Sequence, residues 1–351
     1  MSSFVPGFLE RQPITQNILR TVRLLGEYKG KETLFKQQIP QALETLRQVA
    51  VIQSTESSNR IEGITASPDR LRALLADKTT PGNRSEQEIL GYRDVLSSIH
   101  TNYQHMPLTT GIVRQLHRDL YKYMESEGGR WKPVDNEISE VRADGTKVIR
   151  FRPVPAFATA EHMGALHERC HGLWTAGEVE KLVLIPAYVL DFLCIHPFLD
   201  GNGRMARLLS LLLLYQAGFE VGRYISLEKI VEETRESYYD SLYASSQGWH
   251  ENEHSLLPWT EYFLGVLVAA YREFESRVGL LATARGAKTE MVLEAIRHLP
   301  QDFRMVDVER LCPNVTRDWI RQVFSDLKKQ GVLWCEGKGP AAVWHRRSSL
   351  P

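Results

Sequence analysis

Cysteine, net charge and long apolar runs are all scarce in this chain, and each absence excludes a class of protein. The four cysteines among 351 residues stand at positions 170, 194, 312 and 335. Thiols so widely spaced argue against a disulfide framework or a zinc site and fit a reducing compartment. Lysine plus arginine and aspartate plus glutamate both number 43, so bulk charge gives no reason to expect a nucleic acid or a membrane surface as partner.

No segment approaches the ~20 consecutive apolar residues that a membrane-spanning helix needs. The first residues, Met-Ser-Ser-Phe-Val-Pro-Gly-Phe-Leu-Glu-Arg, lack the basic segment and apolar core of a signal peptide. We therefore expect a cytoplasmic protein with no membrane partner. A hydrophobic content of 43% and a charged content of 25% are ordinary for a globular protein. The length favours two or three domains.

The most informative stretch covers residues 196–207, His-Pro-Phe-Leu-Asp-Gly-Asn-Gly-Arg-Met-Ala-Arg. It separates two nearly all-apolar segments, 182–195 and 208–215, which predict two buried helices. Asp-Gly and Asn-Gly are ordinary turn pairs, but a plain turn requires neither a histidine nor two arginines at fixed offsets around its glycines. The pattern therefore favours a functional loop at the centre of a domain.

The residue types in this loop suit the binding of phosphate. Gly201 and Gly203 let the backbone turn tightly before a helix whose N-terminal amides and dipole attract anions. Arg204 and Arg207 share one helix face, so both guanidinium groups can reach the same anion. Asp200 is a hard oxygen ligand of the kind that holds Mg²⁺ beside phosphates.

Two further side chains complete a reactive site. His196 can be neutral near pH 7 and can take a proton from an incoming hydroxyl, and Asn202 offers an amide to a phosphate oxygen. Together the loop predicts a nucleotide-phosphate site with a general base, whose chemistry is phosphoryl or nucleotidyl transfer.

The loop resembles the Fic family motif, His-x-Phe-x-Asp/Glu-Gly-Asn-Gly-Arg-x-x-Arg, at every defined position. The resemblance implies a mainly α protein with a Fic-type helical core. The family's usual activity is transfer of AMP from ATP to a protein hydroxyl. It implies ATP and Mg²⁺ as ligands, with His196 as general base and Asp200 as the Mg²⁺ ligand. The residues that it assigns to ATP in the loop are Gly201, Asn202, Gly203, Arg204, Met205, Ala206 and Arg207. Relatives that phosphorylate their targets carry Lys where Gly203 stands, which favours AMP transfer here.

A second segment, Ser58-x-x-x-Glu62-Gly63, taken alone is a helix that ends at a glycine cap. Beside the loop it resembles the family's inhibitory signature, Ser/Thr-x-x-x-Glu-Gly/Asn. The resemblance implies an inhibitory helix ahead of the core, in which Glu62 pairs with Arg207 and occupies the place of the ATP γ-phosphate. Ser58 would orient the Glu62 side chain.

A β-hairpin is predicted by two segments, 136–142 and 147–152, that alternate around an Asp-Gly pair. Alone it is a surface hairpin. The resemblance implies a flap opposite the loop that pairs with the backbone of a target protein, and we expect Ile138 to contact that target. Family members often have Trp-Arg where this chain has Trp131-Lys132.

The adjacent pair Tyr238-Tyr239 is typical of a helix packed in a core. The family, however, places a Tyr-Tyr pair at this distance after the motif, against the adenine base. We therefore expect Tyr239 and Ser246 to contact the adenine of ATP.

The C-terminal region, residues 286–351, predicts helices over 289–298, 306–311 and 316–330 and strands over 332–334 and 342–345. This order resembles a winged helix. Its basic residues are Arg317, Arg321, Lys328, Lys329, Arg346 and Arg347. These charges could meet DNA phosphates, but interspersed acidic residues favour a protein-contact or dimer-forming module.

Elsewhere, helical spacing predicts helices over 14–28, 39–53, 85–103, 108–124, 161–174 and 259–278, and turn signals predict irregular chain over 65–81. The expected regions are an N-terminal helical region with the inhibitory helix (1–105), a catalytic core (106–280) and a winged helix (286–351), with a linker or a helix end over 279–286.

The expected function is AMP transfer to a Tyr, Thr or Ser hydroxyl of an unknown target protein and of the chain itself, restrained by Glu62. Three alternatives stay open. The site could remove AMP from a modified protein, it could use another nucleotide, or the chain could be a DNA-binding regulator whose core senses nucleotide.

Overall fold

A computed structural model describes residues 3–38, 40–75, 79–141, 146–282, 287–313, 315–337, 339 and 342–347. Over these residues the protein is mainly helical, as expected from the sequence. Its packing forms two compact units. The first comprises Met1–Glu27, Gln53–Glu220 and Leu227–Ala269, and the second comprises Tyr28–Ile52, Val221–Ser226 and Ala270–Pro351. Each unit draws on separate segments of the chain, because the long helices α2 (Gln16–Gln38), α3 (Pro40–Ile61) and α12 (Leu257–Ala282) contribute residues to both units.

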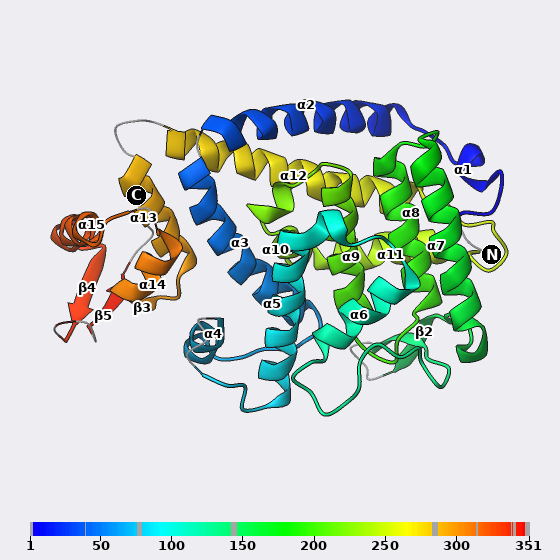
Figure 1. Ribbon diagram of the computed structural model, residues 1–351, viewed down its shortest axis with the longest axis horizontal. Coiled ribbons are helices and arrows are strands. Elements are labelled where there is room, and N and C mark those ends of the chain that lie inside the picture. Colours follow the sequence, from blue (N-terminus) through cyan, green and yellow to red (C-terminus); the bar gives the residue numbers. More distant parts are fainter. Residues whose placement is uncertain are drawn as a thin grey trace. The chain divides into compact units, whose positions relative to one another are not determined.

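The first unit holds most of the helices (Figure 1). They are α1 (Phe8–Arg11), α4 (Pro68–Leu75), α5 (Arg84–Asn102), η1 (Tyr103–His105), α6 (Thr110–Leu120), η2 (Ala156–Ala158), α7 (Thr159–Ala176), α8 (Lys181–Ile195), α9 (Asn202–Gln216), α10 (Leu227–Glu233) and α11 (Arg235–Ser246). Parts of α2 (Gln16–Gln38), α3 (Pro40–Ile61) and α12 (Leu257–Ala282) complete it.

Helices α8 and α9 form the centre of this unit and lie side by side (Figure 1). Leu184, Tyr188 and Phe192 of α8 and Leu208 and Leu212 of α9 are all fully buried. A helix that is apolar on every side is a core helix, and burial of each large apolar side chain contributes about 1.5–3 kcal/mol. The buried pair therefore holds the polar segment between its two ends in a fixed place.

Residues 65–81 were expected to be irregular, and this prediction was wrong for α4. Pro68 occupies the first position of that helix, where its missing N–H costs nothing. The side chain of Ser67 accepts a bond from the N–H of Arg70, and Leu71 and Leu74 are buried. The proline marked a helix start and not a turn. Residues 76–78 lie outside the described part of the chain.

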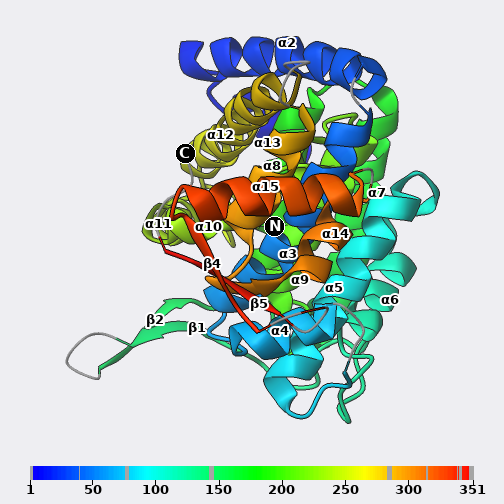
Figure 2. The ribbon, with the colours of Figure 1, turned by 90° about the vertical axis from the view of Figure 1, so that its left-hand side faces the viewer.

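The predicted hairpin is formed by β1 (Ile138–Val141) and β2 (Lys147–Phe151), which pair antiparallel with Ile138 opposite Phe151. A register shift between Ile138 and Ser139 bends the first strand. The hairpin projects from the helices of its own unit (Figure 2). Its expected Asp-Gly turn lies in residues 142–145, outside the described residues.

The second unit contains η3 (Val221–Arg223), α13 (Ala287–His298), β3 (Asp302–Arg304), α14 (Met305–Leu311), α15 (Arg317–Lys329), β4 (Leu333–Glu336) and β5 (Val343–Arg346). The three strands form one antiparallel sheet in the order β3-β5-β4. Strand β3 was not expected, because three residues give no readable alternation. Part of the expected linker, 283–286, and part of the expected wing loop, 338 and 340–341, lie outside the described residues.

Among the described residues, no helix combines the length and the apolar character needed to cross a membrane.

Candidate active site

His196 lies directly after α8, and its backbone adopts the left-handed conformation with φ 51°. Its Nδ1 lies 3.2 Å from the carbonyl oxygen of Leu193. Because a carbonyl only accepts, Nδ1 carries the proton and Nε2 keeps a free lone pair. Burial lowers the pKa of His196 to about 4, against the opposing hydrogen bond to Leu193. The imidazole is therefore neutral at physiological pH and can accept a proton at Nε2.

The backbone of the loop is held by side chains on both sides. Asn202 accepts from the N–H of Phe198 (2.9 Å) and donates to its carbonyl oxygen (2.8 Å). His117 accepts from the N–H of Gly129 at Nδ1 (2.8 Å), so its Nε2 donates to the Asp200 carbonyl oxygen (3.1 Å). The Asn202 side chain, expected to reach a phosphate, is instead occupied within the loop.

The start of α9 has the chemistry that an anion site requires. Gly201 precedes the helix at φ 79°, and no side chain caps it, so a phosphate could bind at the first N–H groups and the positive end of the helix dipole. Met205 and Ala206, which were expected to contact ATP, have buried side chains. The N–H of Met205 already donates to the Gly201 carbonyl oxygen (2.9 Å). Neither side chain reaches the loop surface.

Asp200, the expected Mg²⁺ ligand, is more than half exposed. Its Oδ1 accepts from the N–H of Gly201 (2.7 Å), and its Oδ2 lies 3.2 Å from Nη2 of Arg84. Among the described residues no cluster of three or more metal-ligating side chains occurs. A single exposed carboxylate fits Mg²⁺ that arrives with phosphates, since such ions use only one or two protein carboxylates.

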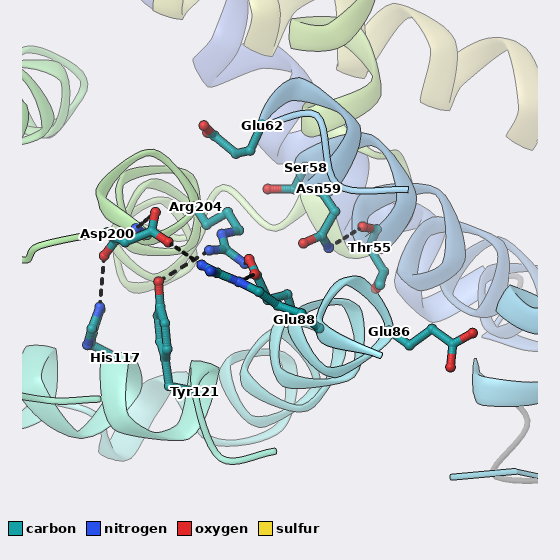
Figure 3. A network of polar contacts seen from close by, with 12 residues as sticks. Thr55, Ser58, Asn59, Glu62, Glu86, Glu88, His117, Tyr121, Asp200 and Arg204 are labelled. Carbon is teal, nitrogen blue, oxygen red and sulfur yellow. Dashed lines mark hydrogen bonds and ion pairs between the residues drawn. The ribbon is translucent and has the colours of Figure 1, made fainter. Parts of the chain in front are cut away.

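Arg204 is fully buried and paired with a residue outside the motif (Figure 3). Its Nη1 lies 2.7 Å from Oε2 of Glu88 on α5, and its Nη2 lies 3.4 Å from the Tyr121 hydroxyl. The other oxygen of Glu88 accepts from Nε of Arg84 (2.7 Å). A continuous chain of charges thus runs from Asp200 through Arg84 and Glu88 to Arg204. No sequence pattern pointed to Arg84, Glu88 or Tyr121.

Arg207 lies on the same face of α9 and contacts the segment that resembles an inhibitory helix. Its Nη2 lies 2.7 Å from Oε1 of Glu62 and 2.9 Å from the Ser58 carbonyl oxygen, and its Nε donates to the Ser58 hydroxyl (2.8 Å). Burial alone would lower the pKa of Arg207, but the Glu62 carboxylate holds it above its usual value. The structure therefore brings Ser58, Glu62 and Arg207 together.

The end of α3 places Glu62 over the start of α9. The N–H of Gly63 donates to Arg60 and that of Ile64 to Asn59, which is the bond pattern of a Schellman cap with Gly63 at φ 77°. A side chain at Gly203 would overlap Oε1 of Glu62. Gly203 thus leaves open the space that the Glu62 carboxylate occupies.

The pair on α11 divides between core and surface. Tyr238 is buried, whereas Tyr239 is 43% exposed and carries the Arg235 guanidinium over its ring. Burial raises the pKa of Tyr239, and the Glu62 carboxylate raises it further. Tyr239 therefore lies near the charges of the site. The Ser246 hydroxyl donates to the carbonyl oxygen of Tyr243 (3.0 Å), and no described contact joins it to the loop.

Ile138, the expected target contact, starts β1 and is partly exposed. The hairpin reaches the loop through Asn136, whose Nδ2 lies 3.1 Å from the Phe198 carbonyl oxygen. Lys132 precedes the hairpin and is 3% exposed. Its backbone N–H donates to the carbonyl oxygen of Pro197 (2.8 Å). The sequence pointed to this lysine only because Trp131-Lys132 stands where the resembled family often has Trp-Arg.

The basic residues of the second unit are largely engaged by its own atoms. Arg317 pairs with Glu309 (3.0 Å), and Arg321 pairs with Asp318 (3.0 Å). Arg346 donates to the carbonyl oxygens at the end of α13. These contacts weaken the case for a DNA-binding surface on α15.

Comparison with known proteins agrees with this geometry. Residues 107–214 match the model described as Fic/DOC family, so the chain carries a Fic/DOC family domain over that range. Protein adenylyltransferase fic-1 of Caenorhabditis briggsae is 27% identical over 233 residues, which cover 64% of this chain and 41% of that protein. The fic-1 adenylyltransferase of Caenorhabditis elegans is 29% identical over 196 residues, covering 54% of this chain and 35% of that protein. The chain thus matches less than half the length of these relatives.

Solved structures show the same fold. A Fic family protein from Desulfovibrio desulfuricans superposes with a TM-score of 0.62 at 21% identity, covering 97% of this chain and 98% of that chain. A Fic domain containing signaling protein from Bacteroides thetaiotaomicron superposes with a TM-score of 0.58 at 22% identity, covering 72% of this chain and 94% of that one. The mainly helical architecture is therefore a Fic fold.

Proposed function

We propose that this chain is a protein adenylyltransferase that transfers AMP from ATP to a Tyr, Thr or Ser hydroxyl of a target protein, and to itself. The observation that carries the proposal is a neutral His196 with a free Nε2 beside the N-terminus of α9 and its two arginines. A base and an anion site so close together suit nucleotidyl transfer. The curated relatives named protein adenylyltransferase support the same chemistry.

In the proposed step the hydroxyl oxygen of the target attacks the α-phosphorus of ATP. One P–O bond forms, the P–O bond to pyrophosphate breaks, and Nε2 of His196 takes the hydroxyl proton. The N–H groups at the start of α9 and the Arg204 and Arg207 side chains would offset the charge of the phosphates. Asp200 would hold Mg²⁺, which neutralises phosphate charge when bound.

We further propose that Glu62 restrains this activity. Its carboxylate occupies the Arg207 guanidinium, which the γ-phosphate would otherwise contact, so ATP would bind with its α-phosphate turned away from the attacking hydroxyl. Arg60 supports the brake, because its side chain makes two bonds to Glu232 on α10 and so ties the end of α3 to its own unit.

The order of helices and the three-stranded antiparallel sheet of the second unit support its assignment as a winged helix. Because its basic residues pair with acidic neighbours, we assign it to protein contact and not to DNA. Formation of a homodimer through it stays a prediction.

Incubation with α-labelled ATP and Mg²⁺ tests the proposal in the wild type, Glu62→Gly and Glu62→Gly/His196→Ala. We expect weak self-labelling in the wild type, a rise of about tenfold or more in the single variant, and a loss of about 10²-fold or more in the double variant. Label that is equal in all three would overturn the assignment of both base and brake.

Two alternatives give other results with the same variants. If the wild type removes AMP from a previously modified lysate and Glu62→Gly does not, the site is a hydrolase in which Glu62 positions water. If label enters only from another nucleotide, the contacts of Tyr239 select a different base. A third alternative, a DNA-binding regulator, would be supported if the purified chain retards duplex DNA in a gel-shift assay.

A further inference from the structure

The root of the hairpin is attached to the loop around His196 by a continuous set of hydrogen bonds. Five consecutive carbonyl oxygens, from residues 194 to 198, accept bonds from residues at the two ends of the hairpin. The Val154 N–H donates to Cys194 (3.3 Å), Lys132 Nζ to Ile195 (3.1 Å), Asn136 Nδ2 to His196 (3.4 Å) and Phe198 (3.1 Å), and the Lys132 N–H to Pro197 (2.8 Å). The catalytic loop and the hairpin therefore share one hydrogen-bonded frame.

Lys132 and Asn136 act as a pair within this frame. The ammonium group of Lys132 also donates to Oδ1 of Asn136 (2.8 Å). Since lysine can only donate, this bond fixes the amide so that its Nδ2 faces the loop. Lys132 is 3% exposed, and burial lowers its pKa to about 8. Burial of a lysine is costly unless its ammonium group is hydrogen-bonded. Here the ammonium group lies at the C-terminal carbonyl end of α8, where the helix dipole favours a cation.

The hydrogen bonds of this frame surround His196, whose backbone is strained. His196 ends α8 in the left-handed conformation, a position that glycine usually occupies. Such backbone costs of the order of 1–3 kcal/mol and persists only where the surroundings fix it. The bonds to the carbonyls on both sides of His196 provide that fixation. They also set the direction of the ring, because the Nδ1 contact to Leu193 depends on this backbone geometry.

We propose that Lys132 and Asn136 form a clamp that joins the root of the hairpin to the loop and positions the His196 imidazole. This inference rests on the proposed function, because it assumes that His196 is the base. Neither residue touches reacting atoms in the proposed step, so both are positioning residues.

The test uses the Glu62→Gly background with Lys132→Met, which keeps length but removes the donor, and Lys132→Arg, which restores donors. Lys122→Met, a change of an exposed lysine, is the matched control. We expect Lys132→Met to lower kcat for AMP transfer about tenfold or more, since misplacement of a reacting group by about 1 Å can cost 10²-fold. The KM for ATP should stay within about twofold, and Lys132→Arg should recover most of kcat.

A pH profile separates positioning from a general loss of structure. The charged groups that act on His196 are Lys132, Glu62 and Asp200. In the Glu62→Gly background the low pKa of about 4 keeps kcat flat from about pH 5.5 to 7.5. Lys132→Met removes a neighbouring cation and the bonds that hold the ring in its buried place, so the pKa of His196 should rise toward its ordinary value of ~6.5. The protonated imidazole cannot act as base, and kcat should therefore fall toward pH 5.5 in this variant only.

Amide hydrogen exchange makes the outcome independent of catalysis. If the clamp exists, the N–H groups of His196 and Phe198 exchange about tenfold faster in Lys132→Met than in Lys122→Met. Absence of label in Glu62→Gly itself would reject the proposed function, and exchange would still decide the clamp. A kcat, a pH profile and exchange rates that match those of Lys122→Met would overturn the proposal.

Discussion

Arg204 and Arg207 differ in what pairs with them, although both are buried arginines on one face of α9. Arg204 pairs with Glu88, whose side chain is 5% exposed and is shared with Arg84. Arg207 pairs with Glu62, whose side chain is 31% exposed and stands at the end of a helix before a glycine cap. Each ion pair has the same separation of 2.7 Å.

The difference lies in how easily each carboxylate can leave. Glu88 lies in the second turn of α5, has both oxygens in ion pairs and is nearly buried, so its removal leaves a buried uncompensated charge. Glu62 can turn toward solvent, while Arg207 keeps its bonds to Ser58. One pair therefore builds the site, and the other is suited to be displaced.

The largest expected effect is on stability. Glu88→Gln should lower the free energy of unfolding by about 3 kcal/mol or more, because Arg204 then lacks a counter-charge in a dry environment. Glu62→Gln should cost about 1 kcal/mol or less, as expected for a partly exposed pair. Urea unfolding monitored by circular dichroism measures both. Equal losses of unfolding free energy in the two variants would show that the two ion pairs contribute equally to stability.

Gly203→Ala examines the space that Glu62 occupies. The added methyl group would overlap Oε1 of Glu62, so the carboxylate should turn toward solvent and away from Arg207, at a cost of about 1 kcal/mol or less in stability. In the Glu62→Gly background the same change should cost less than about 0.5 kcal/mol. Thermal unfolding of the four variants gives the coupling. Additive effects would mean that Glu62 does not rest against Gly203 in solution.

The smallest effect concerns Asp200. Its exposed pair with Arg84 is worth about 0–1 kcal/mol, and Mg²⁺ has to compete with this guanidinium. In the Glu62→Gly background, Arg84→Ala should lower the Mg²⁺ concentration for half-maximal AMP transfer by about two- to fivefold. Arg23→Ala, which removes another exposed pair, is the control. A higher Mg²⁺ requirement would indicate that Arg84 assists the site and does not compete for Asp200.

The sequence predicted the parts of the site that a contiguous motif carries. The loop 196–207 between two apolar helices is such a part, and so is the approach of Glu62 to Arg207, 145 positions apart, which the resemblance implied. The contact itself could not have been derived from periodicity, because nothing in the local pattern of α3 marks which residue meets α9.

The remaining parts depend on packing that no local pattern encodes. Glu88 and Arg84 belong to an ordinary helix, and only the fold brings Arg84 to Asp200 across 116 positions. The bonds of the Asn202 side chain to the backbone of Phe198 could not be read from the motif, and its contact with a phosphate stays a prediction. Helix α4 was missed because a proline signals both a turn and a helix start.

The most direct test is the rate of AMP transfer from α-labelled ATP, measured side by side for wild type, Glu62→Gln and Glu88→Gln at saturating Mg²⁺. The two rates should change in opposite directions, because one substitution frees Arg207 and the other leaves Arg204 without its counter-charge. Glu62→Gln should be about tenfold faster than wild type or more, and Glu88→Gln should be slower. A Glu62→Gln rate at or below that of the wild type, or a Glu88→Gln rate above it, would show that the two ion pairs do not have these different roles.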